Sequence, residues 1–176
     1  MKNLQKLFSM AMLVCMAVTM FSCSKDDEEL GVEAGIVGKW KVTSTETIVN
    51  GMSADAFIKQ LAEQTGVSEE EVRNNDYLDY ENSNEDAGTI VEFSSDNSLI
   101  VKENDDEDNS EGTWRAGENR TVIMKFTNEY GSSEITYDVK SLKSNTATLS
   151  IKEERVVEFM EEEFEIEDEY LIHMKR

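Results

Sequence analysis

The sequence predicts a mainly β fold: an antiparallel, up-and-down barrel of about eight strands, with a helical insertion after the first strand. Apolar and polar residues alternate in two-residue steps through most of the chain after residue 36, which is typical of half-buried strands. Short runs rich in Gly, Asn and Asp separate these segments, and such short loops favour consecutive antiparallel hairpins. One stretch, 53–80, has helical spacing instead.

The chain begins with a leader that has the layout of a secretory signal. Lys2 and Lys6 precede an uncharged stretch, 7–21, which is shorter than the roughly 20 residues that a helix needs to span a bilayer. Ser22 supplies the small residue at a cleavage site, and Met20–Cys23 resembles a bacterial lipobox. We therefore expect residues 1–22 to be removed and Cys23 to carry lipid. The alternative is a plain secretory signal with an incidental cysteine.

The segment after Cys23 bears on where the protein is held. Its run Ser24–Glu29 is similar to the lysine-and-acid export signal of surface lipoproteins in the Bacteroidetes. This resemblance implies an outer-membrane protein anchored by its N-terminal lipid and exposed at the cell surface, with the periplasmic face as the alternative. Two or three acyl chains suffice for stable anchoring. Residues 23–35 are acidic with little to bury, so we expect an acidic tether before a domain at 36–176.

Each expected strand has one apolar face. The predicted inward residues, in chain order, are Trp40 and Val42; Val91 and Phe93; Val122, Met124 and Phe126; Ile135, Tyr137 and Val139; and Ala147, Leu149 and Ile151. Turn residues lie between them at Asp96–Asn97, Gly117–Asn119, Gly131–Ser132 and Asn145. Successive hairpins of this kind favour an up-and-down meander, which can form a barrel or a sandwich.

The insertion at 53–80 predicts two helices. The first begins near Ser53, carries Phe57, Ile58 and Leu61 on one face, and ends at Gly66. The second begins with the capping-box pattern of Ser68 and Glu71. The apolar stripe of the first helix must be buried, and we expect the helices at or near the mouth of the barrel. Packing inside the barrel or on its outer wall are the alternatives.

The C-terminal segment predicts a long strand with one apolar and one acidic face. Phe164, Ile166, Tyr170, Ile172 and Met174 share the apolar side. Asp168 interrupts that side near its middle. The preceding stretch, 153–163, fits both a helix face and a strand face, and a helical turn is the preferred interpretation.

Four short motifs resemble the lipocalin-like domains of Bacteroidetes lipoproteins, members of the lipocalin or calycin barrel family. They are Gly38–Trp40, Val91–Asn97, Gly112–Trp114 and Tyr137–Leu142, and the resemblance spans about residues 36–176. It implies a lipocalin-like barrel in which Trp40 closes the narrow end and packs against a basic residue of the last strand, Lys175 or Arg176. The implied function is binding of a small molecule without catalysis.

Composition excludes several other functions. The net charge of −21, from 38 acidic against 17 basic residues, repels nucleic acid phosphates. His173 is the only histidine and lies on the acidic face of the last strand, and no nucleophile elbow occurs, so we expect no catalytic site. The acidic run 104–109 lacks the spacing of an EF-hand and is better explained as a solvated hairpin tip. We expect no metal and no cofactor.

We therefore expect a monomeric, non-enzymatic barrel that binds a small apolar or amphipathic ligand. The candidate ligand-binding residues are the inward side chains Val91, Phe93, Val122, Met124, Phe126, Tyr137 and Tyr170. A core filled by these same side chains is the alternative for each of them. The alternative for the protein is a surface interaction module that binds a protein or glycan partner and has no ligand cavity.

Overall fold

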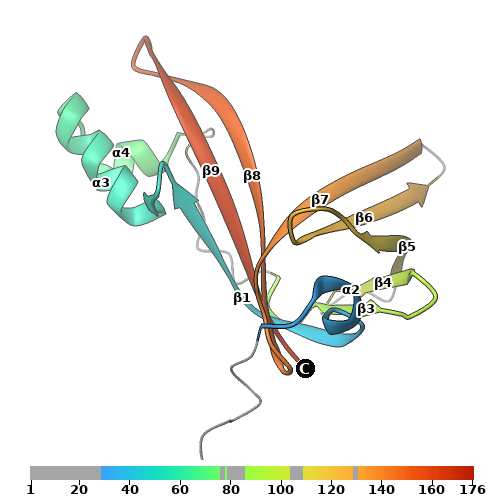
Figure 1. The fold of residues 1–176 in the computed structure, drawn as a ribbon. Helices are drawn as coiled ribbons and strands as arrows, with labels where there is room; N and C mark the ends of the chain where they lie inside the picture. Colours follow the sequence, from blue (N-terminus) through green and yellow to red (C-terminus); the bar gives the residue numbers. More distant parts are fainter. Residues whose placement is uncertain (1–28, 76–77, 79–85, 104–108, 129–130) are drawn as a thin grey trace, which may run out of the picture.

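The structure is a computed structural model that describes residues 29–75, 78, 86–103, 109–128 and 131–176. Its strands follow one another around a single antiparallel sheet (Figure 1). Their bounds are β1 Gly38–Val49, β2 Met52–Ser53, β3 Ile90–Phe93, β4 Ser98–Lys102, β5 Asn109–Ala116, β6 Thr121–Asn128, β7 Gly131–Leu142, β8 Thr146–Phe159 and β9 Glu162–Lys175.

The sheet closes on itself because β1 pairs with both β3 and β9. The closing ladder runs from Lys41 opposite Lys175 to Val49 opposite Asp168. Leaving out the two-residue β2, eight strands form a closed, up-and-down antiparallel barrel, which confirms the predicted fold class. Asn97 and Asn119 have positive φ in the predicted turns, a conformation that asparagine tolerates better than most residues.

One end of the barrel is filled and the other opens. Trp40, Phe93 and Leu142 are at most 1% exposed near the end where β3 meets β4 and β7 meets β8. On β7 the inner face changes from buried at Leu142 and Val139 to half-buried at Tyr137 and Ile135 toward the opposite end, where the β6–β7 and β8–β9 hairpins project (Figure 1). On β8 it is half-buried at Ile151 and buried again at Val157 and Phe159. We call the two ends of the barrel the closed end and the open end.

Residues 29–35 belong to the folded domain, although the sequence places them in the tether. Helix α2 (Val32–Gly35) lies at the closed end, where Val32 and Ile36 join the barrel core. Leu30 N donates a hydrogen bond to Leu142 O at 2.8 Å. The sequence did not predict this contact with the barrel, because the segment is acidic and its few apolar residues follow neither a strand nor a helix period.

The helical insertion forms as predicted and packs at the open end. Helix α3 (Ala54–Thr65) is capped by Ser53 and ends at Gly66 with φ 76°, and α4 (Glu69–Arg73) has the capping box of Ser68 and Glu71. Their buried side chains form a second core with Val49, Val157, Phe159 and Ile166. By strand alternation these four share the inner face of the sheet, so the helices cover the inner face of the β8–β9 extension rather than the polar outer wall.

The stretch 153–163 is a hairpin, and the expected helical turn there is wrong. Strand β8 continues to Phe159, and Met160 and Glu161 make the turn with φ of 54° and 66°. Val157 and Phe159 are buried, whereas Val156 is 62% and Met160 58% exposed. The apolar–polar alternation of this stretch is that of a strand, because the helices bury one face of the hairpin and leave the other face in solvent.

Several predictions fall outside the described residues. These are the leader 1–22, Cys23 and most of the tether, and positions 104–108 of the acidic run. Within the part of the chain that the structure describes, no helix has the length and apolarity needed to cross a bilayer.

Candidate functional site

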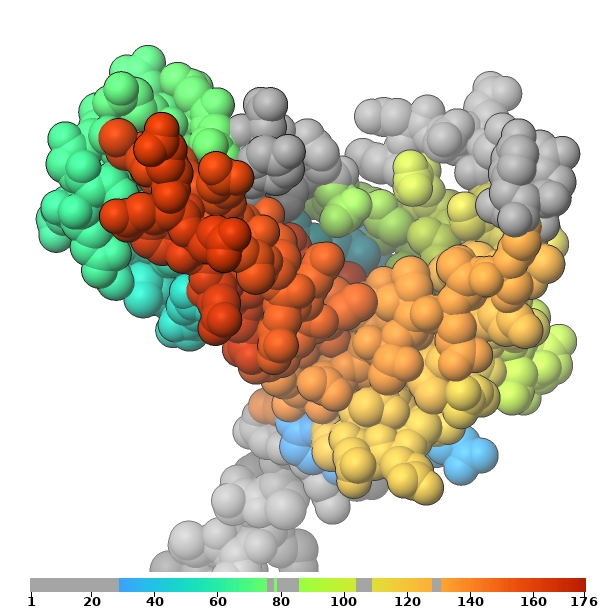
Figure 2. All heavy atoms as spheres, turned by 90° about the horizontal axis from the view of Figure 1, so that it is seen from above, coloured from blue at the N-terminus to red at the C-terminus, as the bar shows by residue number. Residues whose placement is uncertain are grey.

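The open end of the barrel exposes part of an apolar inner face. Half-buried inward side chains gather there from five strands: Val101, Phe126, Ile135, Tyr137, Ile151, Tyr170 and Ile172. Seen from above, the molecule is hollowed between the β8–β9 side and the β6–β7 side (Figure 2). Inward side chains nearer the closed end are buried, at most 8% exposed, so this partial exposure belongs to the open end.

The predicted ligand residues divide between the filled core and the open end. Val91, Phe93, Val122 and Met124 are at most 8% exposed and belong to the core. Phe126 and Tyr137 are partly buried and pack against that core from the open side. Tyr170 is half-buried beside Ile151. The structure therefore gives the first four a packing role and leaves three at the opening.

The closed end is sealed by Trp40 and Arg176. The guanidinium carbon of Arg176 lies 4.4 Å from the ring centroid of Trp40, which confirms a basic partner at the end of the last strand. Trp40 Nε1 donates to Ile36 O at 2.7 Å, and Arg176 Nη2 donates to Gly35 O and Val37 O at 2.6 and 2.7 Å. Lys175, the other candidate, is exposed. These hydrogen bonds connect the C-terminal Arg176 to residues 35–37, which lie at the closed end of the barrel.

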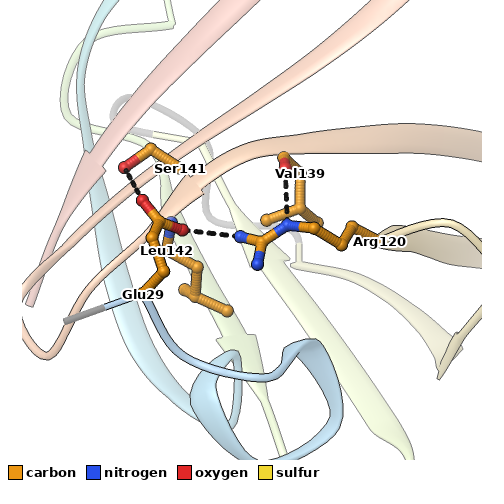
Figure 3. Close-up of polar contacts among 5 residues, drawn as sticks. All are labelled: Glu29, Arg120, Val139, Ser141 and Leu142. Carbon is orange, nitrogen blue, oxygen red and sulfur yellow. Dashed lines mark hydrogen bonds and ion pairs between the residues drawn. The ribbon is translucent and has the colours of Figure 1, made fainter.

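A second contact at the closed end holds the N-terminal segment. The Glu29 carboxylate accepts hydrogen bonds from Leu142 N at 3.1 Å, Ser141 Oγ at 3.2 Å and Arg120 Nη2 at 2.6 Å (Figure 3). The Leu142 amide is the main cause that lowers the pKa of Glu29, with Ser141 and Arg120 adding to it. The charged form of Glu29 is therefore favoured in the folded protein.

The rim of the open end carries a buried ion pair. Arg155 Nε lies 2.6 Å from Asp168 Oδ2, with Asp168 fully buried and the Arg155 side chain 27% exposed. Both point to the inner face, between the barrel core and the helix-covered core. Arg155 was not among the site residues predicted from the sequence. Asp168 on the apolar face of the last strand could have indicated it, because a buried carboxylate needs a cation nearby.

Two tyrosine hydroxyls add polar groups to this inner face. Burial raises the pKa of Tyr137, and the charge of Asp86 raises it further. Burial also raises the pKa of Tyr170, with an added effect from Asp168. Both phenols are therefore neutral at pH 7 and can donate or accept a hydrogen bond.

His173 lies outside this site, on the outer wall. Its Nδ1 is 3.1 Å from Thr148 Oγ1, and its Nε2 is 3.8 Å from Glu46 Oε2. The same wall carries ion pairs of Lys140 with Glu169 and of Lys152 with Glu167, each at 2.7 Å. In the described ranges, no three His, Cys, Asp or Glu side chains are grouped as metal ligands.

Two surface pockets lie away from the predicted ligand residues. One, of about 460 Å³, lies at the closed end beside Glu33, Trp114 and Glu118. The other, of about 610 Å³, lies on the β8–β9 hairpin and is lined by Asn50, Glu154, Arg155, Val156, Glu165, Ile166 and Glu167. None of the seven predicted ligand residues lines either pocket.

No family model and no curated protein matches this chain.

Proposed function

We propose that this protein is a non-catalytic, lipid-anchored protein of the cell envelope whose barrel binds a small apolar or amphipathic molecule at its open end. The observation that carries the proposal is the asymmetry of the inner face, which is buried at the closed end and half-buried around Tyr137, Ile151 and Tyr170 toward the other. Eight-stranded barrels are just wide enough to hold one small ligand. Apolar walls with a few polar groups are typical of such sites.

The side chains at the opening define the chemistry of the ligand. Phe126, Ile135 and Ile151 offer apolar contact to a hydrocarbon or aromatic body. Tyr137 and Tyr170 offer neutral hydroxyls for a polar end. Because the predicted residues nearer the closed end are packed as core, the ligand sits in the upper part of the barrel only.

Anchoring at Cys23 is part of the proposal. The leader, the lipobox-like Met20–Cys23 and the acidic run after it support attachment to the outer membrane, with the barrel facing the cell surface. Glu29 is held at the closed end by its contact with Leu142 N, so only residues 24–28 separate Cys23 from that contact along the chain. The open end then points away from the membrane.

Binding of an environment-sensitive apolar dye tests the ligand site. We expect a Kd of about 1 μM, equivalent to about 8 kcal/mol. Ile151→Asp places a charge on the half-buried inner face and should weaken binding at least about tenfold. Val156→Asp is the matched control, because it makes the same change on the outer face of the same strand, where the side chain is already 62% exposed.

The far-ultraviolet circular dichroism of both variants should match the wild type. Dye binding that is absent in the wild type, or equal in the two variants, would contradict the proposal.

A further inference from the structure

The barrel wall is split between β7 and β8. Their ladder runs only from Leu142 opposite Ala147 to Asp138 opposite Ser150. Beyond this point the β6–β7 and β8–β9 hairpins diverge toward the open end (Figure 1). Among the residues that the structure describes, no strand pairs with β7 over 131–137 or with β8 over 151–159 on the facing sides. The result is two strand edges, seven and nine residues long by these bounds.

The backbone groups that point to the β8 edge follow from the register. Asn50 N donates to Glu167 O, and Glu167 N donates to Asn50 Oδ1, each at 2.8 Å. Both main-chain groups of Glu167 therefore point away from β8. Its cross-strand partner Glu154 must then point its own N–H and C=O away from β9. By alternation, Lys152, Val156 and Glu158 do the same.

Such an edge is a template for another extended chain. Every second residue offers one donor and one acceptor at the spacing of a β ladder. Neither a proline nor a bulge blocks this edge, since no proline occurs in the chain and no bulge interrupts the β8–β9 ladder. Its protection is charge, from Lys152, Glu154 and Glu158, which disfavours partners without complementary charge. Val156, in the middle of the edge, is a large apolar side chain that is 62% exposed.

The charge around the edge selects the partner. Between 151 and 169 the only basic residues are Lys152 and Arg155, against a large excess of acids. The pocket of about 610 Å³ on the β8–β9 hairpin combines Val156 with the carboxylates of Glu154, Glu165 and Glu167, and the cation in its lining, Arg155, is paired with Asp168. This lining suits the aliphatic stem and charged head of a lysine or arginine. A second copy of this chain is disfavoured because each carries a net charge of −21.

We propose that the free edge of β8 receives an extended, basic segment of a partner protein as an added strand. Main-chain hydrogen bonds to Lys152, Glu154, Val156 and Glu158 supply the affinity, and the acidic outer face selects basic side chains. The surface is the edge and outer face of the wall, separate from the inner face that the ligand proposal uses. The two proposals therefore stand or fall independently.

A synthetic nonapeptide of alternating lysine and valine is the probe, added to the full-length protein. Val156→Pro removes one edge N–H without touching the β8–β9 ladder, since this N–H points away from β9. We expect it to weaken peptide binding by about tenfold, the equivalent of one to two lost backbone hydrogen bonds. Val156→Thr keeps the N–H and is the matched control, with affinity within about threefold of wild type.

Hydrogen exchange gives the second measurement. On peptide binding, the amides of Glu154, Val156 and Glu158 should exchange at least about tenfold more slowly, because they become ladder donors. A peptide methylated on alternate backbone nitrogens keeps all its charges and should lose this protection. Dye binding should be unchanged in Val156→Pro.

Equal affinity of the wild type and Val156→Pro for the peptide would show that charge attraction alone holds it, and would overturn the proposal. So would equal binding of the methylated peptide. A dimer of the wild type that Val156→Pro abolishes would place a second copy on the edge and would also overturn it.

Discussion

Arg155 Nε and Asp168 Oδ2, 2.6 Å apart, form an ion pair that joins the two cores of the molecule. On one side lies the barrel core around Trp40 and Phe93, and on the other lies the core between helices α3 and α4 and the β8–β9 extension. The pair lies where the inner face changes from barrel wall to helix support. Asp168 is fully buried, so its charge depends on protein partners rather than on water.

Asp168→Asn should destabilise the fold strongly. It leaves the Arg155 guanidinium without its carboxylate in a largely buried position, which typically costs about 3–5 kcal/mol. Urea denaturation followed by tryptophan fluorescence measures the change. Glu134→Gln is the control, because the pair of Arg115 and Glu134 is at 3.3 Å with both side chains at least half-exposed. We expect that change to cost at most about 0.5 kcal/mol; equal losses would show that the Arg155 pair has no special role.

Trp40→Ala should cost about 3–5 kcal/mol, because it empties a fully buried site at the closed end. Arg176→Met should cost less, since it keeps the stem over the ring. It removes the cation–π contact and the bonds to Gly35 O and Val37 O, together about 1–3 kcal/mol. Thermal unfolding of both variants tests this order. An unchanged melting temperature for Trp40→Ala would contradict its barrel-closing role.

The Glu29 contact predicts a pH dependence. The pKa of Glu29 is lower in the folded protein than its ordinary value of 4.5, mainly because of the Leu142 amide. A lowered folded pKa means that this carboxylate stabilises the fold at pH values above 4.5 and that the stabilisation is lost as pH falls through the folded pKa. Glu29→Gln should therefore be less stable than wild type at pH 7.

The difference in stability between wild type and Glu29→Gln should shrink below about pH 4.5. Melting temperatures of both proteins between pH 3 and pH 7 measure it. A difference that is constant across this range would show that the carboxylate charge is irrelevant to docking of residues 29–35.

Leu61→Asp should detach the helices while the barrel persists. Leu61 is 2% exposed in the helix-supporting core, so a carboxylate there would be buried among the apolar side chains of that cluster. We expect loss of the helical signal near 222 nm with the β signal retained, and altered dye binding. Gln60→Asp adds the same charge on the exposed face of α3 and should change neither. Loss of the whole fold in Leu61→Asp would show that the two cores are one cooperative unit.

Cys23→Ala tests the anchor. If acyl chains on Cys23 hold the protein, this variant should move from membrane to soluble fractions when expressed in a Gram-negative envelope. Ser24→Ala, next to it, should remain with the membrane. Continued partition of Cys23→Ala with membranes would contradict the lipoprotein assignment. Proteinase added to intact cells separately tests exposure at the cell surface.

Much of the fold could be predicted from the sequence because local chemistry controls it. Alternation around Val91, Val122 and Leu149 fixes which side chains face inward, since a strand has a period of two. The caps at Ser53 and Ser68 fix where the helices begin, since each satisfies backbone donors a few residues away. The packing of Trp40 against a basic residue at the C-terminus was predicted from the family resemblance and not from local chemistry.

The candidate site was less predictable. An inward pattern gives the same signal for a packed core and for a ligand wall, so Val91 and Tyr137 could not be told apart until their depth in the barrel was known. Arg155 was missed because a helical turn was preferred for 153–163, and only a continuous β8 puts Arg155 on the same face as Asp168.

By itself, the sequence determined most of the strands, their inward faces and the helix caps, because each depends on neighbours within a few residues. The closure of the barrel pairs β1 with β9, far apart in the chain, and was expected from the family resemblance. Only the tertiary structure decided where α3 and α4 pack, since an amphipathic stripe requires burial without choosing the surface that buries it. It also decided that β7 and β8 part at Asp138 and Ser150. Alternation assigns a residue to a face, but the twist and divergence of whole hairpins set how far two strands remain paired.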